Sequence, residues 1–225
     1  MFKKGFTLAE VLLTLGIIGV VAALTIPSLI SHYHKKVVET RLAKFHSVIN
    51  QAVQRSIVDN HEPEHWVEDP EVLNGSEVDY NKLYEKYIIP YLDSVMYTDI
   101  DNGRIYTMKD GNSFSPNYDE HCSNNDASGI GFAISKDALV NAAWDIRHEK
   151  DFGKKIFCFN FPKISKYSSV RNRVTSNTIA PSKFTLGNTA MCAKPFQDDY
   201  RELAECAYVI MLNGWKIPDN YPIKF

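Results

Sequence analysis

The sequence has little net charge and few cysteines. Its 25 Lys and Arg residues nearly balance its 27 Asp and Glu residues, which leaves a formal charge of −2. A dedicated nucleic-acid-binding protein normally carries a strong basic excess, so we expect no nucleic-acid partner. The four cysteines form no C-x-x-C pair. This spacing argues against a zinc ribbon, a thioredoxin-like site and a small domain built on disulfides.

The sequence also lacks the common motifs of enzyme active sites. It contains no G-x-S-x-G, P-loop or Rossmann glycine pattern, and no spacing of Ser, His and Asp singles out a catalytic triad. We therefore expect no enzymatic activity and no cofactor, with an enzyme of unrecognised active site as the remaining alternative.

Two short strings resemble metal sites. His61 and His65 match the H-E-x-x-H string of zinc proteases, but Pro63 between them does not fit the interior of the helix that this motif requires. We therefore predict a solvated loop there. Asp99 and Asp101 resemble the start of a calcium loop, but the next glycine comes one position early and the closing glutamate is missing. These patterns predict no metal site, and calcium binding stays a minor alternative.

A stretch without any charged residue runs from Val11 to Ser31. A helix of about 21 residues is roughly 31 Å long, the thickness of the hydrocarbon core of a bilayer. The stretch is longer than the apolar region of a secretory signal peptide and has no clean small-residue cleavage site. A plain signal anchor explains the length but not Glu10, because a carboxylate near lipid is costly and usually functional. We predict a transmembrane helix over about residues 11–31.

The residues before this helix carry a specific motif. The sequence KKGFTLAE at residues 3–10, followed by the apolar run, resembles the class III leader of type IV pilins and of the pseudopilins of type II secretion systems. The resemblance implies that a prepilin peptidase cuts after Gly5 and that the new N-terminal residue, Phe6, is N-methylated. It further implies that Glu10 pairs with the free N-terminal amine of a neighbouring subunit. A proline matching Pro27 marks, in such proteins, a kink and a segment that loses helicity when the filament packs.

The same resemblance implies a location and a set of partners. Residues 1–5 would be the leader peptide, and the mature chain would cross the inner membrane once, with its N-terminus inside and its C-terminal domain outside. An assembly ATPase and a platform membrane protein would then move it into a filament with other pilin-like subunits. The expected function is that of a structural subunit of a type II secretion pseudopilus or a type IV pilus-like filament.

The apolar pattern changes after the charge-free stretch. Apolar or small residues recur at a spacing of three to four, which predicts that one helix continues to about residue 58 and packs one face on a globular domain. These positions are Val38, Leu42, Phe45, Ile49, Ala52 and Ser56. We therefore divide the mature chain into a helix over residues 6–58 and an extracytoplasmic domain over residues 59–225. The expected fold class is α+β, a pilin-like long N-terminal helix packed on a small antiparallel sheet.

Several elements are expected inside the globular domain. Pro90 ends a short helix over residues 80–92, and Asn102-Gly103 suits a type I′ turn between strands at 95–101 and 104–108. The remaining expected elements are strands at 129–134 and 155–161, helices at 137–148 and 198–212, loops at 110–128 and 165–183, and an extended tail at 215–225.

The expected location predicts the oxidation state of the four cysteines. Outside the cytoplasm they can oxidise, and Cys192 with Cys206 resembles the C-terminal disulfide loop of many type IV pilins. Cys122 with Cys158 would then be the complementary pair. Four buried thiols are the alternative.

One function of another class competes with the filament subunit. The chain would then be a membrane-tethered binding module or adhesin that uses the pilin helix only as an anchor. Four tyrosines at 80, 84, 87 and 91 would supply an aromatic surface if they were exposed, but we expect them in the core.

Overall fold

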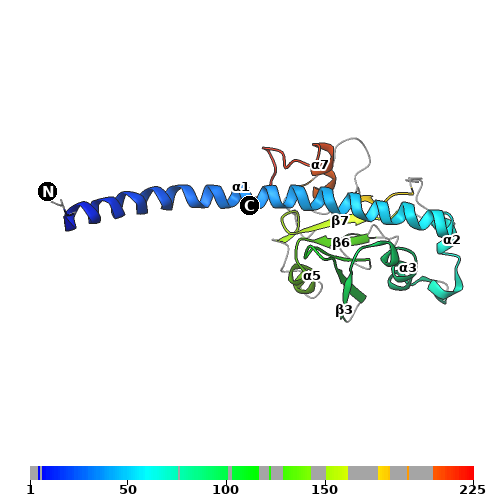
Figure 1. Cartoon of the computed structure of the whole chain (residues 1–225). Coiled ribbons are helices and arrows are strands. Elements are labelled where there is room, and N and C mark those ends of the chain that lie inside the picture. The colour runs from blue at the N-terminus through cyan, green and yellow to red at the C-terminus, as the bar shows by residue number, and fades with distance from the viewer. Residues whose placement is uncertain are drawn as a thin grey trace. The chain divides into compact units, whose positions relative to one another are not determined.

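A computed structural model describes residues 5, 7–75, 77–100, 103–116, 122, 129–142, 151–161, 177–182, 192 and 205–225. The chain divides into two compact units. The first comprises residues 1–37 with Phe225, and the second comprises Val38–Lys224. The helix α1, Leu8–Asn60, belongs to both units, because it contributes the first unit's helix and the first element of the second (Figure 1).

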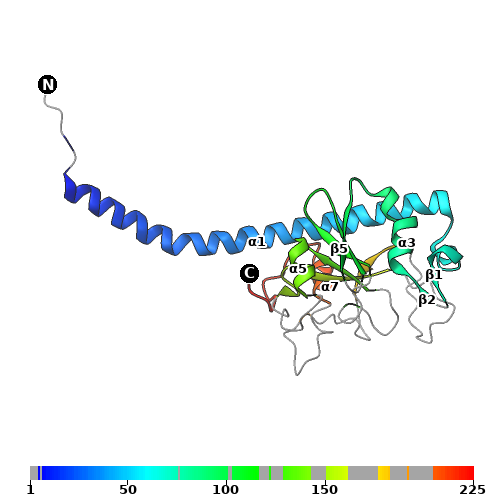
Figure 2. The ribbon, with the colours of Figure 1, turned by 90° about the horizontal axis from the view of Figure 1, so that it is seen from below.

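The C-terminal part of α1 buries one face. Its buried residues are Val38, Leu42, Phe45, Ile49, Ala52, Val53 and Ser56, which confirms the stripe predicted from the spacing of apolar residues. In the second unit this part of α1 lies along the sheet in both views (Figure 1, Figure 2). The helix predicted over residues 6–58 thus continues two residues further, to Asn60.

In the described part of the chain the sheet has six strands, each paired antiparallel with the next, in the order β3-β4-β5-β6-β7-β8. The strands are β3 Met96–Ile100, β4 Gly103–Thr107, β5 Ser113–Ser115, β6 Gly129–Ala133, β7 Ile156–Asn160 and β8 Ala180–Pro181. Together with α1 they give the α+β layout that the sequence predicts.

Aromatic rings form the core between helix and sheet. The ring of Phe45 from α1 stacks on Phe132 from β6 at 4.3 Å between centroids, and it meets the edge of Phe159 from β7 at 5.1 Å. Phe114 from β5 adds a tilted contact with Phe45 at 5.7 Å. All four rings are fully buried. Such buried rings dominate core energetics because each removes a large apolar area from water.

Polar groups of α1 also hold the second unit together. Arg41 donates a hydrogen bond to the Ile134 carbonyl at 2.6 Å. Asn50 exchanges two hydrogen bonds with the backbone of Ile179, at 2.7 and 2.8 Å. Because each contact satisfies backbone groups beside strand ends, these polar residues fix where α1 lies along the sheet.

The second unit contains several shorter elements. They are α2 Pro63–Trp66, η1 Pro70–Val72, β1 Leu73–Asn74, β2 Glu77–Val78, α3 Tyr80–Tyr87, η2 Ile89–Tyr91, α5 Lys136–Ala142 and α7 Cys206–Leu212. Strands β1 and β2 pair as a separate two-stranded sheet. Residues 213–225 adopt no helix or strand.

The structure corrects three of the expected elements. Gly103 pairs with Ile100 as the first residue of β4, so it belongs to the strand rather than to the predicted turn. The helix predicted over residues 80–92 ends at Tyr87, and Pro90 sits in the separate 3-10 turn η2. Pro63 is the first residue of α2, so part of the expected loop at 61–65 is helical.

Two expected loops contain strands. Residues 113–115 form β5, and residues 180–181 form β8. The helices predicted over residues 137–148 and 198–212 are described as α5 and α7, and residues 143–150 and 198–204 lie outside the described residues.

Glu39 and Gly153 hold the C-terminal tail. The Glu39 carboxylate accepts hydrogen bonds from the Ile217 amide at 3.0 Å and from Lys216 Nζ at 3.1 Å. The Tyr221 hydroxyl donates to the Gly153 carbonyl. Gly153 has φ +70°, and a Cβ there would lie 2.3 Å from the Ile223 side chain. Because a side chain at residue 153 would clash with Ile223, the tail can pack at this position only against a glycine.

Candidate membrane anchor and assembly site

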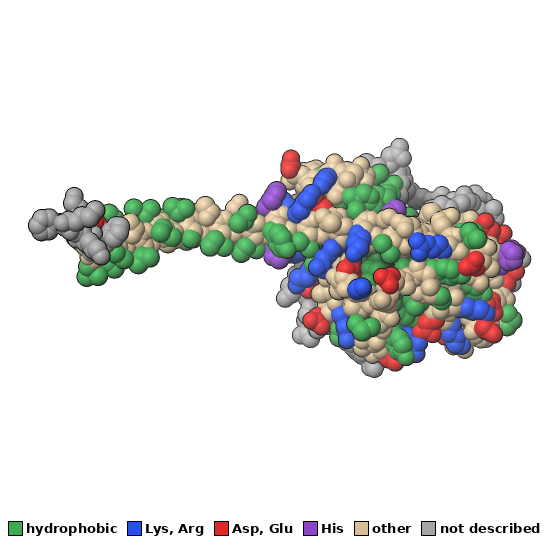
Figure 3. Space-filling view, viewed as in Figure 1, with side chains coloured by type: hydrophobic (Ala, Val, Ile, Leu, Met, Phe, Trp, Pro, Cys, Tyr) green, Lys and Arg blue, Asp and Glu red, His purple; other side chains and the backbone are tan. Residues whose placement is uncertain are grey.

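The first part of α1 exposes apolar side chains on all its sides. Every large apolar side chain from Leu8 to Ile30 is at least 42% exposed, and the candidate membrane span in this helix has no buried residue. The space-filling view shows the green side chains of this segment (Figure 3). A helix that is apolar all round is suited to a hydrocarbon environment rather than to one side of a water-soluble core. The geometry is therefore that of a helix able to cross a membrane.

Glu10 and Thr7 close the N-terminus of this helix. The Glu10 carboxylate Oε2 accepts hydrogen bonds from the Thr7 amide and from Thr7 Oγ1, both at 2.8 Å. In return, the Glu10 amide donates to Thr7 Oγ1 at 3.2 Å. This reciprocal arrangement is a capping box, which satisfies two amides that a helix start leaves without partners.

The capping box gives Glu10 a role that the sequence analysis missed. The T-x-x-E spacing of residues 7–10 was visible in the sequence, and this spacing is the signal for such a cap. Both hydrogen bonds to the carboxylate end on Oε2. Within the described residues, Oε1 has no hydrogen-bond donor. One carboxylate oxygen of Glu10 thus remains available for a partner from outside the chain.

The other residues of the predicted leader and kink are placed as follows. Gly5 is exposed and precedes the helix, while Phe6 lies outside the described residues. Pro27 lies inside α1, and the helix continues through it. Proline removes one backbone donor. The Thr25 hydroxyl, close by, donates to the Val21 carbonyl at 2.9 Å, a side-chain contact that membrane helices tolerate well.

Two disulfides cross-link the second unit. Cys122 bonds to Cys158 on β7, and Cys192 bonds to Cys206 at the start of α7. This pairing agrees with the one expected from the resemblance and excludes four free thiols in this structure. Cys122, Cys158 and Cys206 are fully buried.

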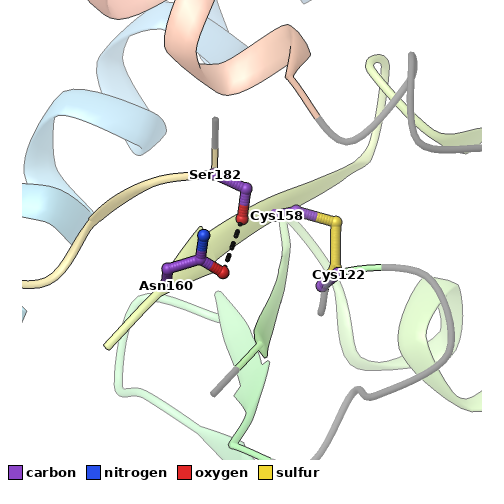
Figure 4. Close-up of a disulfide and its surroundings, with 4 residues drawn as sticks. All are labelled: Cys122, Cys158, Asn160 and Ser182. Atoms are coloured by element: carbon purple, nitrogen blue, oxygen red, sulfur yellow. Dashed lines mark hydrogen bonds between the residues drawn. A yellow bond between two sulfur atoms is a disulfide. The ribbon is translucent and has the colours of Figure 1, made fainter. Parts of the chain in front are cut away.

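The Cys122–Cys158 bridge lies beside a hydrogen-bonded polar pair, the buried Ser182 and the half-buried Asn160 (Figure 4). The Ser182 hydroxyl is hydrogen-bonded to the Asn160 side-chain amide at 3.0 Å, and the Ser182 backbone amide donates to the Cys158 carbonyl at 3.0 Å. The bridge and the edge of the sheet at β7 and β8 therefore form one connected cluster.

The four tyrosines do not form an open aromatic surface. Tyr84 and Tyr87 are buried, and Tyr87 stacks on Trp66 at 4.9 Å between centroids. Burial raises the pKa of Tyr84 well above its usual value. Hydrogen bonds from Lys86 and Tyr87 lower the pKa of Asp69 to about 2. These contacts belong to a packed core with a paired charge at its edge.

Tyr80 and Tyr91 are half-buried. The Tyr91 hydroxyl donates to Asp59 and accepts from Asn60, each at 2.9 Å. Tyr91 therefore supports the C-terminal end of α1.

Neither metal-like string forms a coordinating set in the described part of the chain. No group of three or more His, Cys, Asp or Glu side chains is placed to hold a metal among the described residues. The rings of His61 and His65 lie 6.3 Å apart, with His61 outside α2. Asp99 pairs with Arg104 at 2.6 Å, and Asp101 lies outside the described residues.

The comparisons with known proteins give one relationship. No curated protein and no solved structure matches the chain. A family model, described as a family of unknown function (DUF6613), matches residues 28–225. The matched range covers the second unit and begins just after Pro27. The chain therefore belongs to the DUF6613 family.

Proposed function

We propose that this chain is a pilin-like structural subunit that a prepilin peptidase processes and that enters a type II secretion pseudopilus or a type IV pilus-like filament. The observation that carries the proposal is the exposed apolar helix from Leu8 to Ile30, with its carboxylate at residue 10 and the KKGFTLAE motif at its start. An apolar helix of this length suits both a membrane and the core of a helical bundle. In either place its side chains leave water.

The capping box lies wholly in the part of the chain that remains after leader cleavage. Cleavage after Gly5 makes Phe6 the first residue, so Thr7 and Glu10 stay in the mature chain. The new α-amino group then adds a positive charge beside a helix N-terminus that is already partly positive. A carboxylate from a neighbouring copy relieves this repulsion, and Glu10 keeps Oε1 available for such a contact.

The helix couples the membrane to the folded domain. Residues 38–56 of α1 bury their apolar face against the sheet, while residues 8–30 expose theirs. In the proposed mechanism the exposed part exchanges lipid for the helices of other subunits, so little apolar area returns to water during assembly. The two disulfides suit a domain that folds in an oxidising compartment outside the inner membrane.

Intact-mass measurement tests the processing step. We expect protein purified from membranes of a host with an active prepilin peptidase to have the mass of Phe6–Phe225 with one added methyl group and two disulfides. A Gly5→Val variant places a side chain at the cut site and should remain at full length in the same membranes. A wild-type mass that matches Met1–Phe225 in that host would contradict the proposal.

A further inference from the structure

The end of the charge-free helix carries a ring of polar, basic and aromatic side chains. Residues 32–36 are His32, Tyr33, His34, Lys35 and Lys36. We call them the collar. They directly follow the uncharged stretch that ends at Ser31 and lie in the first unit of the chain. Purple histidine side chains gather where the green apolar segment ends (Figure 3).

The collar surrounds the helix rather than lining one face. Successive residues of an α-helix are rotated by about 100°, so five consecutive residues point to all sides. Tyr33 is 66% exposed, His32, His34 and Lys36 are exposed, and Lys35 is half-exposed. Lys36 also has other interactions within the chain, so we rest the argument on the whole ring.

The height of the collar matches the lipid headgroups. A helix that begins its apolar run at Val11 crosses roughly 31 Å of hydrocarbon by Ser31, so the next turn lies in the headgroup layer. Tyrosine prefers this layer because its ring is apolar and its hydroxyl is polar. Lysines there extend their charged ends toward phosphate while their stems stay in apolar surroundings.

We infer that the collar binds the headgroups of anionic phospholipids on the side of the membrane where the globular domain lies. This inference rests on the proposed insertion of the chain in a membrane. The lysines supply charge, the histidines supply ring N–H donors, and the tyrosine sets the depth. Since each basic residue near an anionic bilayer contributes a moderate attraction, two lysines favour anionic over neutral lipid beside the helix. The collar thereby holds the subunit at one depth before assembly.

The experiment measures which lipids the full-length protein retains. The protein is reconstituted in vesicles of phosphatidylcholine with about one fifth phosphatidylglycerol, extracted in mild detergent, and its bound lipids are quantified by mass spectrometry. We expect the ratio of phosphatidylglycerol to phosphatidylcholine among the bound lipids to exceed the bulk ratio by about fivefold for each lysine engaged. High salt should reduce this enrichment.

A pair of double variants separates the collar from total charge. Lys35→Gln with Lys36→Gln should lower the enrichment toward the bulk fraction, while Lys82→Gln with Lys109→Gln, which removes two exposed lysines of the second unit, should leave it unchanged. Near-UV circular dichroism shows whether each variant keeps its tertiary structure. Equal enrichment in the wild type and the collar variant would overturn the inference.

Three further outcomes count against it and differ from one another. If the wild type resists alkaline extraction from the vesicles but retains no excess phosphatidylglycerol, the chain is inserted and the collar does not select anionic lipids. If the wild type is removed by alkaline extraction, membrane insertion itself fails, and the proposed function falls with the inference. A collar variant that keeps the lipid preference but does not enter filaments would assign the lysines to carboxylates of another protein.

Discussion

At the scale of single residues, Glu10 has two roles that experiments can separate. Its carboxylate caps α1 through Thr7, and in the proposed filament it pairs with the amine of another subunit. Glutamine at the same position can still accept the Thr7 amide, because the capping box works with either Glu or Gln. It has no charge to offer to an amine.

We predict that Glu10→Gln keeps membrane insertion and leader cleavage but strongly reduces the incorporation of subunits into sheared filaments. Thr7→Val, the matched control, removes the hydroxyl of the cap and keeps the charge. We expect it to lower helix stability by about 1 kcal/mol and to assemble nearly normally. Incorporation is measured as the ratio of sheared to membrane-bound protein on blots.

The opposite pattern would assign Glu10 to the cap alone. If Thr7→Val assembles poorly and Glu10→Gln assembles like wild type, the carboxylate is needed to start the helix and does not register one subunit against another.

At the scale of elements, α1 combines two helices of different character in one span. Its exposed apolar part and its one-sided part follow directly from the spacing of apolar residues, which is why the sequence predicts the helix well. Val38, Leu42, Phe45 and Ile49 recur every three or four positions, and all four are buried. Periodicity is a reliable signal when a helix is long, since many residues repeat the same pattern.

The shorter strands could not be predicted in the same way. Strand β5 is only three residues long, and its two serines are buried together with Phe114, so its burial does not follow the polar and apolar pattern of its sequence. Strand β8 has two residues and contains Pro181, which normally argues against a strand. Residues such as Arg41 and Asn50 anchor α1 through polar contacts that depend on distant segments, and local sequence carries no sign of those contacts.

We predict that Phe45→Ala lowers the free energy of unfolding of the globular domain by about 3–5 kcal/mol, because it removes a ring that packs on Phe132 and Phe159. The control is Val58→Ala on the same helix, where the side chain is 83% exposed. Its effect should stay within about 0.5 kcal/mol. Denaturant titration of the full-length protein in detergent, followed by tryptophan fluorescence, gives both values.

Similar losses for the two variants would mean that the C-terminal part of α1 contributes to stability in another way than through its buried face. They would also weaken the proposal that this helix links the membrane to the folded domain.

At the scale of the whole molecule, the two units differ in whether their apolar side chains are exposed or buried. The first exposes apolar side chains, and the second buries an aromatic core between α1 and the sheet and contains two disulfides. The candidate site at residues 5, 6, 10 and 27 stays a prediction, made from the local motif at residues 3–10 and from the place of Pro27 in the apolar stretch. The sequence analysis did not identify Thr7 as the capping partner of Glu10, because it considered only the free energy that a carboxylate near lipid costs.

In the proposed function, this chain is part of a filament. Immunogold electron microscopy with an antibody to the globular domain, applied to filaments sheared from cells that express the chain at its natural level, tests it most directly. We expect gold particles along or at the tips of the filaments, and none on filaments from cells that lack the chain. Filaments that form without any label, while the chain stays wholly in the membrane fraction, would contradict the account and favour a membrane-tethered binding module.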